Sequence, residues 1–213
     1  GLPGARGGMQ VTAIWLTDDE IEQLEMHAPS LRDRLLIQLG AYCGLRINET
    51  ARAQVGDFHE ENVDGDLHYF LDVEGKQTDQ EAGGETEKKE RETWVPREVW
   101  KNYRTLVNER NLAPTNHLIQ SRNGGGLHPD SARKRVKAIA LDAADATGNE
   151  RLGDVSSHDL RRYFAHTLLE ERGVNPRVVM DLGGWEDFQS IEPYLNKPSR
   201  STKARELSSA GWD

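Results

Sequence analysis

The sequence predicts a mainly α-helical fold with one small antiparallel β-sheet, an α+β class. Most of the chain divides into segments whose apolar residues recur at helical spacing and whose ends carry capping signals. Two segments, 67–73 (LHYFLDV) and 92–95 (ETWV), are instead rich in the aromatic and branched residues that are typical of strands. With 213 residues, of which 36% are hydrophobic, the chain is long enough to bury one core.

The first part of the chain is predicted to form three helices. Thr17 begins a capping-box pattern and a helix that runs to about His27. Ser30 caps a second helix, whose apolar residues end at Gly44, a residue type that suits a helix C-terminus. A short third helix is expected over 48–53.

The two predicted strands come next and should pair as a hairpin. The segment between them (QTDQEAGGETEKKER) is polar and lacks apolar periodicity, so we interpret it as a long surface loop. Further helices should complete the chain: one that starts at Pro96, one over 129–146, one capped by Ser156 or Ser157 and reaching Glu171, one from Asn175-Pro176 to near Gly183-Gly184, and a short one over 202–207.

The chain is acidic, with 36 Asp and Glu residues against 27 Lys and Arg and a formal net charge of −9. Because phosphate contact favours basic surfaces, the total charge argues against nucleic acid as a partner. The field at a local site matters more than the total, however, and the basic residues are mostly arginine. An evenly acidic, lysine-poor surface predicts a salt-loving archaeal host, in which salt screens the self-repulsion.

The sequence carries no sign of export or membrane insertion. No apolar run approaches the roughly 18 residues of a membrane span, and no signal-peptide pattern begins the chain. The single cysteine, Cys43, excludes an intrachain disulfide and is expected to be a small buried hydrophobe. We therefore predict a cytoplasmic protein, with residues 1–8 (GLPGARGG) as a flexible leader or expression remnant and residues 9–213 as one domain.

Three polar clusters, far apart in the sequence, carry the candidate chemistry. Arg46 follows an apolar helix, His158 and Arg161 lie at the start of another, and Tyr194 follows Trp185 near the C-terminus. His158 and Arg161 are three residues apart and share one helix face, at a helix N-terminus whose N–H groups favour an anion. An isolated H-x-x-R pattern is more often a surface pair, so the pattern alone does not establish a phosphate site.

Together the three clusters resemble the tyrosine recombinase (phage integrase) family, over nearly the whole chain after Met9. AYCGLRINETARAQVGDF is similar to the family's G-L-R-x-x-E element, and SSHDLRRYFAHTLLEERGVNPRVVMDLGGW is similar to its H-x-L-R box and the L-G-H/W element that follows. Tyr194 comes nine residues after Trp185, the family's usual spacing. The resemblance predicts the tyrosine recombinase catalytic-domain fold.

The resemblance implies a role for each matching residue. Arg46 and Arg161 would hold the non-bridging oxygens of a scissile DNA phosphate, and the indole of Trp185 would donate to the same group. His158 would take part in proton transfer. Tyr194 would attack phosphorus to form a 3′-phosphotyrosyl link, so that neither ATP nor a metal is required.

The family also uses a lysine on the sheet hairpin as general acid, and here the sequence departs from the pattern. Lys76, in the G-K pair after the first hairpin strand, is our choice. The loop that follows is longer and more acidic than usual, so Lys88 and Lys89 remain competitors.

DNA-backbone contacts are expected from a basic run in the helix over 129–146, whose alternative interpretation is a solvated helix face. The predicted DNA-binding residues are Arg133, Lys134, Arg135 and Lys137 of this run, together with Arg162, which stands where the family that the chain resembles often has a histidine. Other polar residues have structural interpretations: Glu49 should orient an arginine. Trp185 could be a core aromatic and Tyr194 an interface anchor.

No cluster has the sequence spacing of a metal site, so no metal or cofactor is expected. The histidines interpreted as structural are His27, His59, His68, His117 and His166.

The predicted function is site-specific recombination of double-stranded DNA. A non-catalytic DNA-binding protein on the same fold and a type IB topoisomerase are the alternatives. The family's N-terminal helical domain is missing from this sequence, because the catalytic pattern begins at Ile14, so we expect a fragment of a longer protein. Such a chain should be a monomer without DNA and should assemble with other protomers, as a tetramer, on paired sites.

Overall fold

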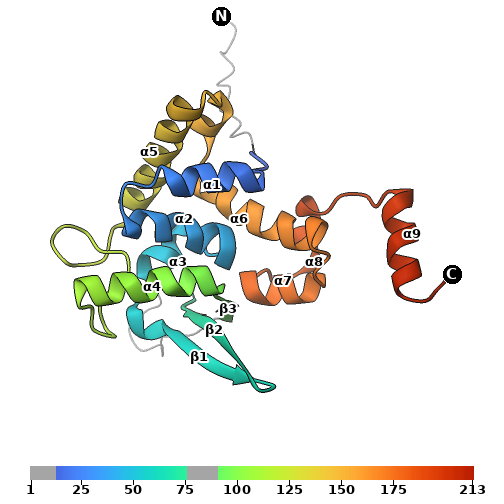
Figure 1. Ribbon diagram of the computed structural model, residues 1–213, viewed down its shortest axis with the longest axis horizontal. Coiled ribbons are helices and arrows are strands. Elements are labelled where there is room, and N and C mark those ends of the chain that lie inside the picture. The colour runs from blue at the N-terminus through green and yellow to red at the C-terminus, as the bar shows by residue number, and fades with distance from the viewer. Residues whose placement is uncertain (1–12, 76–90) are drawn as a thin grey trace, which may run out of the picture.

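The computed structural model describes residues 13–75 and 91–213 and has the predicted α+β composition (Figure 1). The predicted leader, 1–8, and the three candidate lysines Lys76, Lys88 and Lys89 lie outside the described residues. In chain order the helices and strands are α1 (Asp18–Met26), α2 (Leu31–Cys43), α3 (Ile47–Arg52), β1 (Phe58–Val63), β2 (Asp66–Val73), β3 (Arg91–Trp94), α4 (Arg97–Arg110), α5 (Pro129–Thr147), α6 (Ser157–His166), α7 (Pro176–Gly183), α8 (Phe188–Ile191) and α9 (Arg200–Ser209).

Helix α2 lies at the centre of the molecule and separates two parts of the core. One of its faces, with Leu35 and Leu39, packs toward α4 and the sheet, and the opposite face, with Leu36 and Ile37, packs toward α1, α5 and α6. All these side chains are essentially inaccessible to solvent. A helix that is apolar on both faces must be covered on both, and this accounts for its central position.

The sheet is antiparallel, in the order β1-β2-β3, and its inner face covers α4. The predicted hairpin is confirmed, since Leu71 of β2 pairs with Thr93 of β3. On the same face Tyr69 stacks on Trp100 of α4, with ring centroids 4.5 Å apart. Thr93 adds a hydrogen bond to the carbonyl oxygen of Cys43, which ties β3 to the end of α2.

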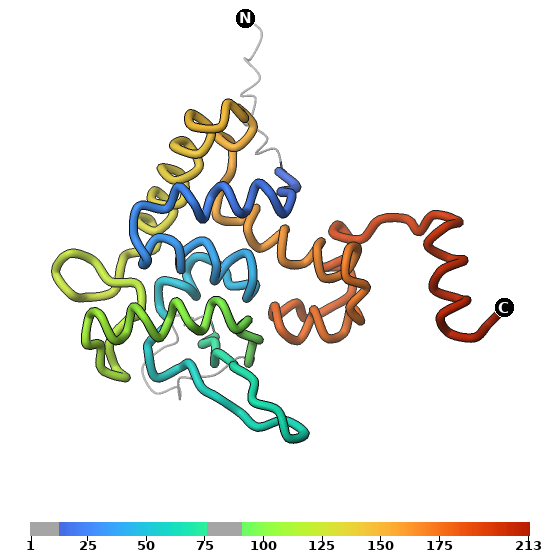
Figure 2. Tube along the Cα trace, viewed as in Figure 1, coloured from blue at the N-terminus to red at the C-terminus, as the bar shows by residue number. Residues whose placement is uncertain are grey.

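A third apolar cluster joins the end of α6 to the C-terminal segments. It contains Phe164, Val179, Trp185, Ile191 and Tyr194, all buried. Two of the predicted catalytic side chains, Trp185 and Tyr194, are therefore part of a packed cluster. Beyond it α9 extends away from the body and buries no residue (Figure 2).

Most of the predicted helices are confirmed, but several features differ, among them α8 (Phe188–Ile191), which was not predicted. The predicted helix that reaches Glu171 consists of α6 and a π-helical turn, Thr167–Glu171. Strand β1 was not predicted: in its sequence, FHEENV, only Phe58 is buried, because β1 is an edge strand with one wet face. The predicted helix over 202–207 is present as the longer α9.

The fold also bears on the single cysteine and on the length of the apolar helices. Cys43 is fully buried, as predicted, and burial raises the pKa of its thiol. Within residues 13–75 and 91–213, no helix has both the length and the hydropathy needed to cross a bilayer.

Replacing Gly44 by alanine is expected to destabilise the domain. Gly44 has φ +76°, and a Cβ there would lie 2.6 Å from the ring of Phe164. Left-handed backbone costs a residue with a Cβ about 1–2 kcal/mol, and the clash should add about 1–3 kcal/mol. Gly148→Ala is the matched control, since Gly148 has φ +72° but no atom within 4 Å of its Cβ position. Urea denaturation should show the larger loss for Gly44→Ala; equal losses would contradict the close approach.

Candidate active site

The turn between α2 and α3 positions Arg46. Gly44 ends α2 in the left-handed conformation; its amide donates to the carbonyl of Gly40, and the Leu45 amide donates to the carbonyl of Leu39. Arg46 then forms the N-cap of α3, and its side chain remains 37% exposed. The guanidinium therefore leaves the helix junction toward solvent, where it can reach a ligand.

Glu49 holds this turn in place, as predicted for its structural role. One of its carboxylate oxygens accepts from the Arg46 amide at 2.8 Å, and the other lies 3.3 Å from Nη1 of the Arg46 side chain. Arg91, which the sequence did not single out, donates to the two oxygens of Glu49 at 2.7 and 2.9 Å and through Nε to the Leu182 carbonyl. The pair links α3, β3 and the end of α7.

The Glu49–Arg91 pair is buried, with both side chains 4% exposed. Burial alone would raise the pKa of Glu49, but the hydrogen bonds and charge of Arg91, with the bond from the Arg46 amide, outweigh it and lower that pKa. Glu49 is therefore a carboxylate at neutral pH. The sequence predicts that Arg91 ends a polar surface loop, and this prediction is wrong: Arg91 is the first residue of β3 and is buried.

The start of α6 is fixed by Asp159. This buried carboxylate accepts from the amides of Ser156 and Ile14, at 2.8 and 3.0 Å, and from the guanidinium of Arg162 at 2.7 Å. His158, one residue earlier, lies on the exposed side of the first helical turn. Partial burial and then the charges of Arg162 and Arg161 lower the pKa of His158, so the imidazole is neutral near pH 7 and can accept a proton.

Arg161 is the most deeply buried of the predicted catalytic side chains. Its Nη1 donates to the carbonyl oxygens of Gly44 and Gly183, each at 2.6 Å. Its guanidinium carbon lies 3.9 Å from the centroid of the Trp185 ring. The side chain thus joins the end of α2 to the end of α7, and it fixes a cation against the indole.

One nitrogen of Arg161, Nη2, is buried and has no hydrogen-bond partner among the described residues. Burial, followed by the charges of Arg46 and Arg91, lowers the pKa of Arg161 to about 9, which leaves it cationic at neutral pH. A buried donor without a partner costs free energy, and so do neighbouring like charges. An anion between Arg161 and Arg46 would relieve both costs.

Two glycines shape the position of Trp185. A Cβ on Gly183 would lie 1.9 Å from the indole, and one on Gly184, which has φ +74° and ends α7, would lie 2.9 Å from Nη1 of Arg91. The L-G-G-W segment therefore allows the indole to lie directly on the backbone. Trp185 is buried and packs on Phe164, so it is a core aromatic residue as well as a neighbour of Arg161.

Tyr194 lies in a 3-10 turn, Glu192–Tyr194, with its ring against Trp185 at a centroid distance of 5.7 Å. Trp15 covers it from the N-terminal side at 6.0 Å, and Nδ1 of His166 lies 3.2 Å from the Tyr194 carbonyl oxygen. The phenol oxygen makes no hydrogen bond within the described parts of the chain. Its ring is held in place by its contacts with Trp15 and Trp185.

A second tyrosine, Tyr163 of α6, is a poor alternative nucleophile. Its hydroxyl donates to Asp18 at 2.6 Å. Burial and the Asp18 carboxylate raise its pKa. Its ring also packs on Tyr42, away from the Trp185–Tyr194 contact.

The predicted DNA-binding residues do not share one environment. Arg133 bonds Asn48 of α3 and Asp130, near the Arg46 turn, and Lys134 is exposed. Arg135 turns toward α2 and bonds the buried Asp33 at 2.9 Å. The remaining two also have protein partners: Lys137 bonds the Gly153 carbonyl oxygen and Arg162 bonds Asp159.

Five predicted catalytic residues thus meet at the junction of α2, α6 and α7. Arg161, Trp185 and Tyr194 are in a continuous series of contacts, and Arg46 and His158 lie within electrostatic reach of Arg161. Such an arrangement can bind a phosphodiester beside a phenol and an imidazole.

Comparison with known proteins agrees with the fold. The chain matches the sequence model of the Phage integrase family over residues 14–200. It is 30% identical over 170 residues to the tyrosine recombinase XerC of Alcanivorax borkumensis, covering 78% of this chain and 48% of that protein. It is 25% identical over 192 residues to the tyrosine recombinase XerA of Pyrococcus furiosus, covering 88% and 59% respectively.

Among solved structures, the chain is similar to the XerH site-specific recombinase bound to its difH substrate, in a pre-cleavage complex. The TM-score is 0.68 with 22% sequence identity, and the match covers 93% of this chain and 54% of that one. The chain spans about half the length of the curated relatives that it matches. The predicted tyrosine recombinase catalytic-domain fold is confirmed, and the chain belongs to the phage integrase family.

Proposed function

We propose that this chain is the catalytic part of a site-specific DNA recombinase that cuts and rejoins strands through Tyr194. The observation that carries the proposal is the buried guanidinium of Arg161. It lies on the ring of Trp185, which contacts Tyr194, and its Nη2 has no hydrogen-bond partner among the described residues. A phosphodiester is an anion whose oxygens match the planar guanidinium, and here it would lie beside a phenol.

In the proposed reaction the Tyr194 oxygen attacks phosphorus and displaces the 5′-hydroxyl oxygen. One P–O bond forms as another breaks, so the 3′-phosphotyrosyl link retains the bond energy and no nucleotide cofactor or metal is required. Arg161 and Arg46 neutralise the charge that grows on the non-bridging oxygens, and the Trp185 N–H donates to the same phosphate. Attack by the 5′-hydroxyl of another strand reverses the step and rejoins the DNA.

The proton of the phenol needs an acceptor, and the leaving oxygen needs a donor. We assign the first role to His158, because its lowered pKa favours the neutral, proton-accepting form near pH 7. Lys76 is our choice for the second role, with Lys88 and Lys89 as competitors. All three lysines lie outside the described residues.

The proposed substrate is double-stranded DNA, and the proposed assembly is a tetramer on two paired sites. The matches cover only about half of each relative's length, so we propose that the corresponding regions of a longer protein add further contacts to the DNA. Arg133 and Lys134 are the best placed of the predicted backbone contacts, because Arg133 already bonds α3 next to Arg46. We propose that the isolated chain is a cytoplasmic monomer that binds its site weakly.

Covalent capture on nicked DNA tests the proposal. Wild-type protein is incubated with nicked duplexes of randomised core sequence, which cannot be rejoined after cleavage, and denaturing gels separate protein–DNA adducts for sequencing. An adduct is expected for the wild type and none for Tyr194→Phe. An adduct that persists in Tyr194→Phe would refute Tyr194 as the nucleophile, with Tyr163→Phe as the next variant to test. Plasmid relaxation without paired sites would favour the topoisomerase alternative.

A further inference from the structure

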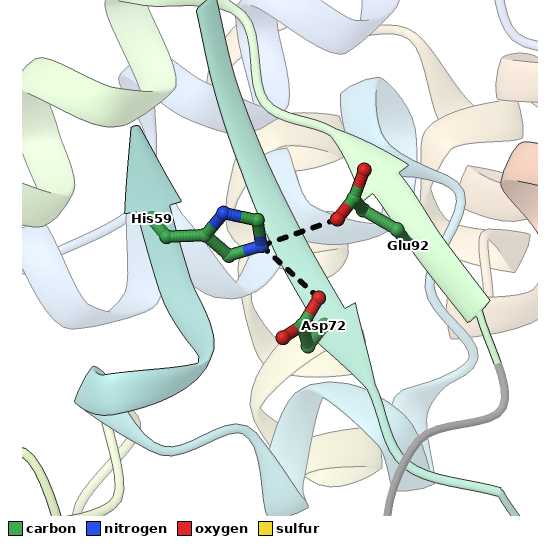
Figure 3. A group of neighbouring side chains, drawn as sticks. All are labelled: His59, Asp72 and Glu92. Carbon is green, nitrogen blue, oxygen red and sulfur yellow. Dashed lines mark hydrogen bonds and ion pairs between the residues drawn. The ribbon is translucent and has the colours of Figure 1, made fainter. Parts of the chain in front are cut away.

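The solvent-facing side of the sheet carries a cluster that the proposed reaction does not use. His59 of β1, Asp72 of β2 and Glu92 of β3 point toward one another (Figure 3). Nε2 of His59 lies 3.0 Å from Oδ1 of Asp72 and 3.3 Å from Oε2 of Glu92. The three side chains are only 26% to 36% exposed, and one ligand atom from each lies within 4.8 Å of the others.

The strand register explains why these groups meet. Asp72 is paired directly with Glu92 across β2 and β3. His59 is paired with Phe70, two residues before Asp72 on the same face of β2, and the two rings stack at a centroid distance of 6.0 Å. Adjacent strands therefore fix all three side chains, and Phe70 supports the imidazole.

A fourth residue orients the imidazole from its other side. Oε1 of Glu61 lies 2.8 Å from Nδ1 of His59. Histidines that bind metals commonly donate their second ring N–H to a carboxylate, which fixes the tautomer and directs the lone pair of the first nitrogen at the ion. Here Nε2 hydrogen-bonds Asp72 at 3.0 Å and lies 3.3 Å from Glu92, so a metal ion at this position would replace the proton of Nε2.

We propose that His59, Asp72 and Glu92 form a binding site for a divalent transition-metal ion of the zinc type. Tetrahedral zinc with bonds of about 2.0–2.2 Å to nitrogen and oxygen places neighbouring ligand atoms roughly 3.3 Å apart, close to both measured separations. An imidazole among the ligands favours zinc over calcium or magnesium, which prefer sets of oxygen ligands. Water would complete the coordination.

The ligands come from three strands, so spacing along the sequence could not indicate the site. On that criterion the sequence predicts no metal site and indicates a structural role for His59. A bound ion would join β1, β2 and β3 on the face opposite the helices, and it would stabilise the edge strand β1. The site takes no part in the proposed phosphate chemistry and does not depend on it.

Metal titration of the whole chain tests the site without DNA. Protein treated with chelator and dialysed is titrated with zinc chloride by isothermal titration calorimetry. Cobalt chloride is added in parallel, because its visible absorption reports ligand geometry. One zinc ion per chain is expected for the wild type, with a rise in the melting temperature. His59→Ala and Asp72→Asn should lose this binding, and Glu61→Gln should weaken it by about 10- to 100-fold.

His68→Ala is the matched control, because His68 lies on the same sheet face against Trp94, outside the cluster. It should bind zinc like the wild type, and circular dichroism should show all variants folded. The proposal is overturned if the wild type shows no saturable binding, or if folded His59→Ala and Asp72→Asn bind zinc as the wild type does. It is equally overturned if His68→Ala loses binding to the same extent as His59→Ala.

Discussion

Arg161→Lys is expected to slow covalent capture of DNA by on the order of 100- to 1,000-fold, the effect of removing one donor from a developing oxyanion. A lysine ammonium is a point charge on a flexible stem. It cannot stack on Trp185, donate to the Gly44 and Gly183 carbonyls and still direct a further N–H outward. The positive charge is retained, so the loss isolates the geometry of the planar guanidinium.

The measurement must separate chemistry from folding, because Arg161 also joins α2 to α7. Single-turnover cleavage rates at saturating protein are compared with DNA affinity and with the melting temperature of each variant. Arg97→Lys is the control, since Arg97 bonds the Leu67 carbonyl oxygen and lies over the ring of Tyr69, which packs on a different apolar cluster from that of Trp185 and Tyr194. If folded Arg161→Lys cleaves at more than about half the wild-type rate, Arg161 does not contact the phosphate as proposed.

Much of the fold is predictable from the sequence because its signals are local. The capping box at Thr17, the serine caps at Ser30 and Ser156, and the glycine ends at Gly44 and Gly184 are all present in the structure. A cap depends on residues three or four positions away, so a single sequence contains the full interaction. The candidate site was predictable for a different reason, since the three clusters match a family pattern in order and spacing.

What the sequence could not predict depends on contacts between distant segments. Strand β1 has only Phe58 buried, so its polar residues show no strand pattern, and its stability comes from pairing with β2. Arg91 follows a polar run, and only the fold brings it to Glu49, 42 residues earlier. His59, Asp72 and Glu92 likewise meet only after the sheet has formed. In each case the structural role of the residue depends on a partner that is distant in the sequence.

Glu49→Gln is expected to lower the free energy of unfolding by about 3–5 kcal/mol, because it leaves the Arg91 guanidinium buried beside a neutral amide. The effect should depend on pH. The pKa of Glu49 is lowered by the fold, so its stabilisation is complete above the unfolded-state pKa of about 4.3 and is lost as the pH falls through the folded-state value. Urea denaturation should therefore show a large difference between wild type and variant at pH 7 that shrinks below pH 4.

The control for this change is an exposed pair of the same kind. Glu98→Gln breaks the surface bridge to Lys101, whose side chains are 80% and 69% exposed, and should change stability by less than about 0.5 kcal/mol. The buried pair does not hold α3, β3 and α7 together if Glu49→Gln lowers the free energy of unfolding as little as Glu98→Gln does. The same conclusion follows if the loss for Glu49→Gln does not vary with pH. If it does hold them, Glu49→Gln should also slow DNA capture in the folded protein, because Arg46 and the Gly183 carbonyl that orients Arg161 would both lose their support.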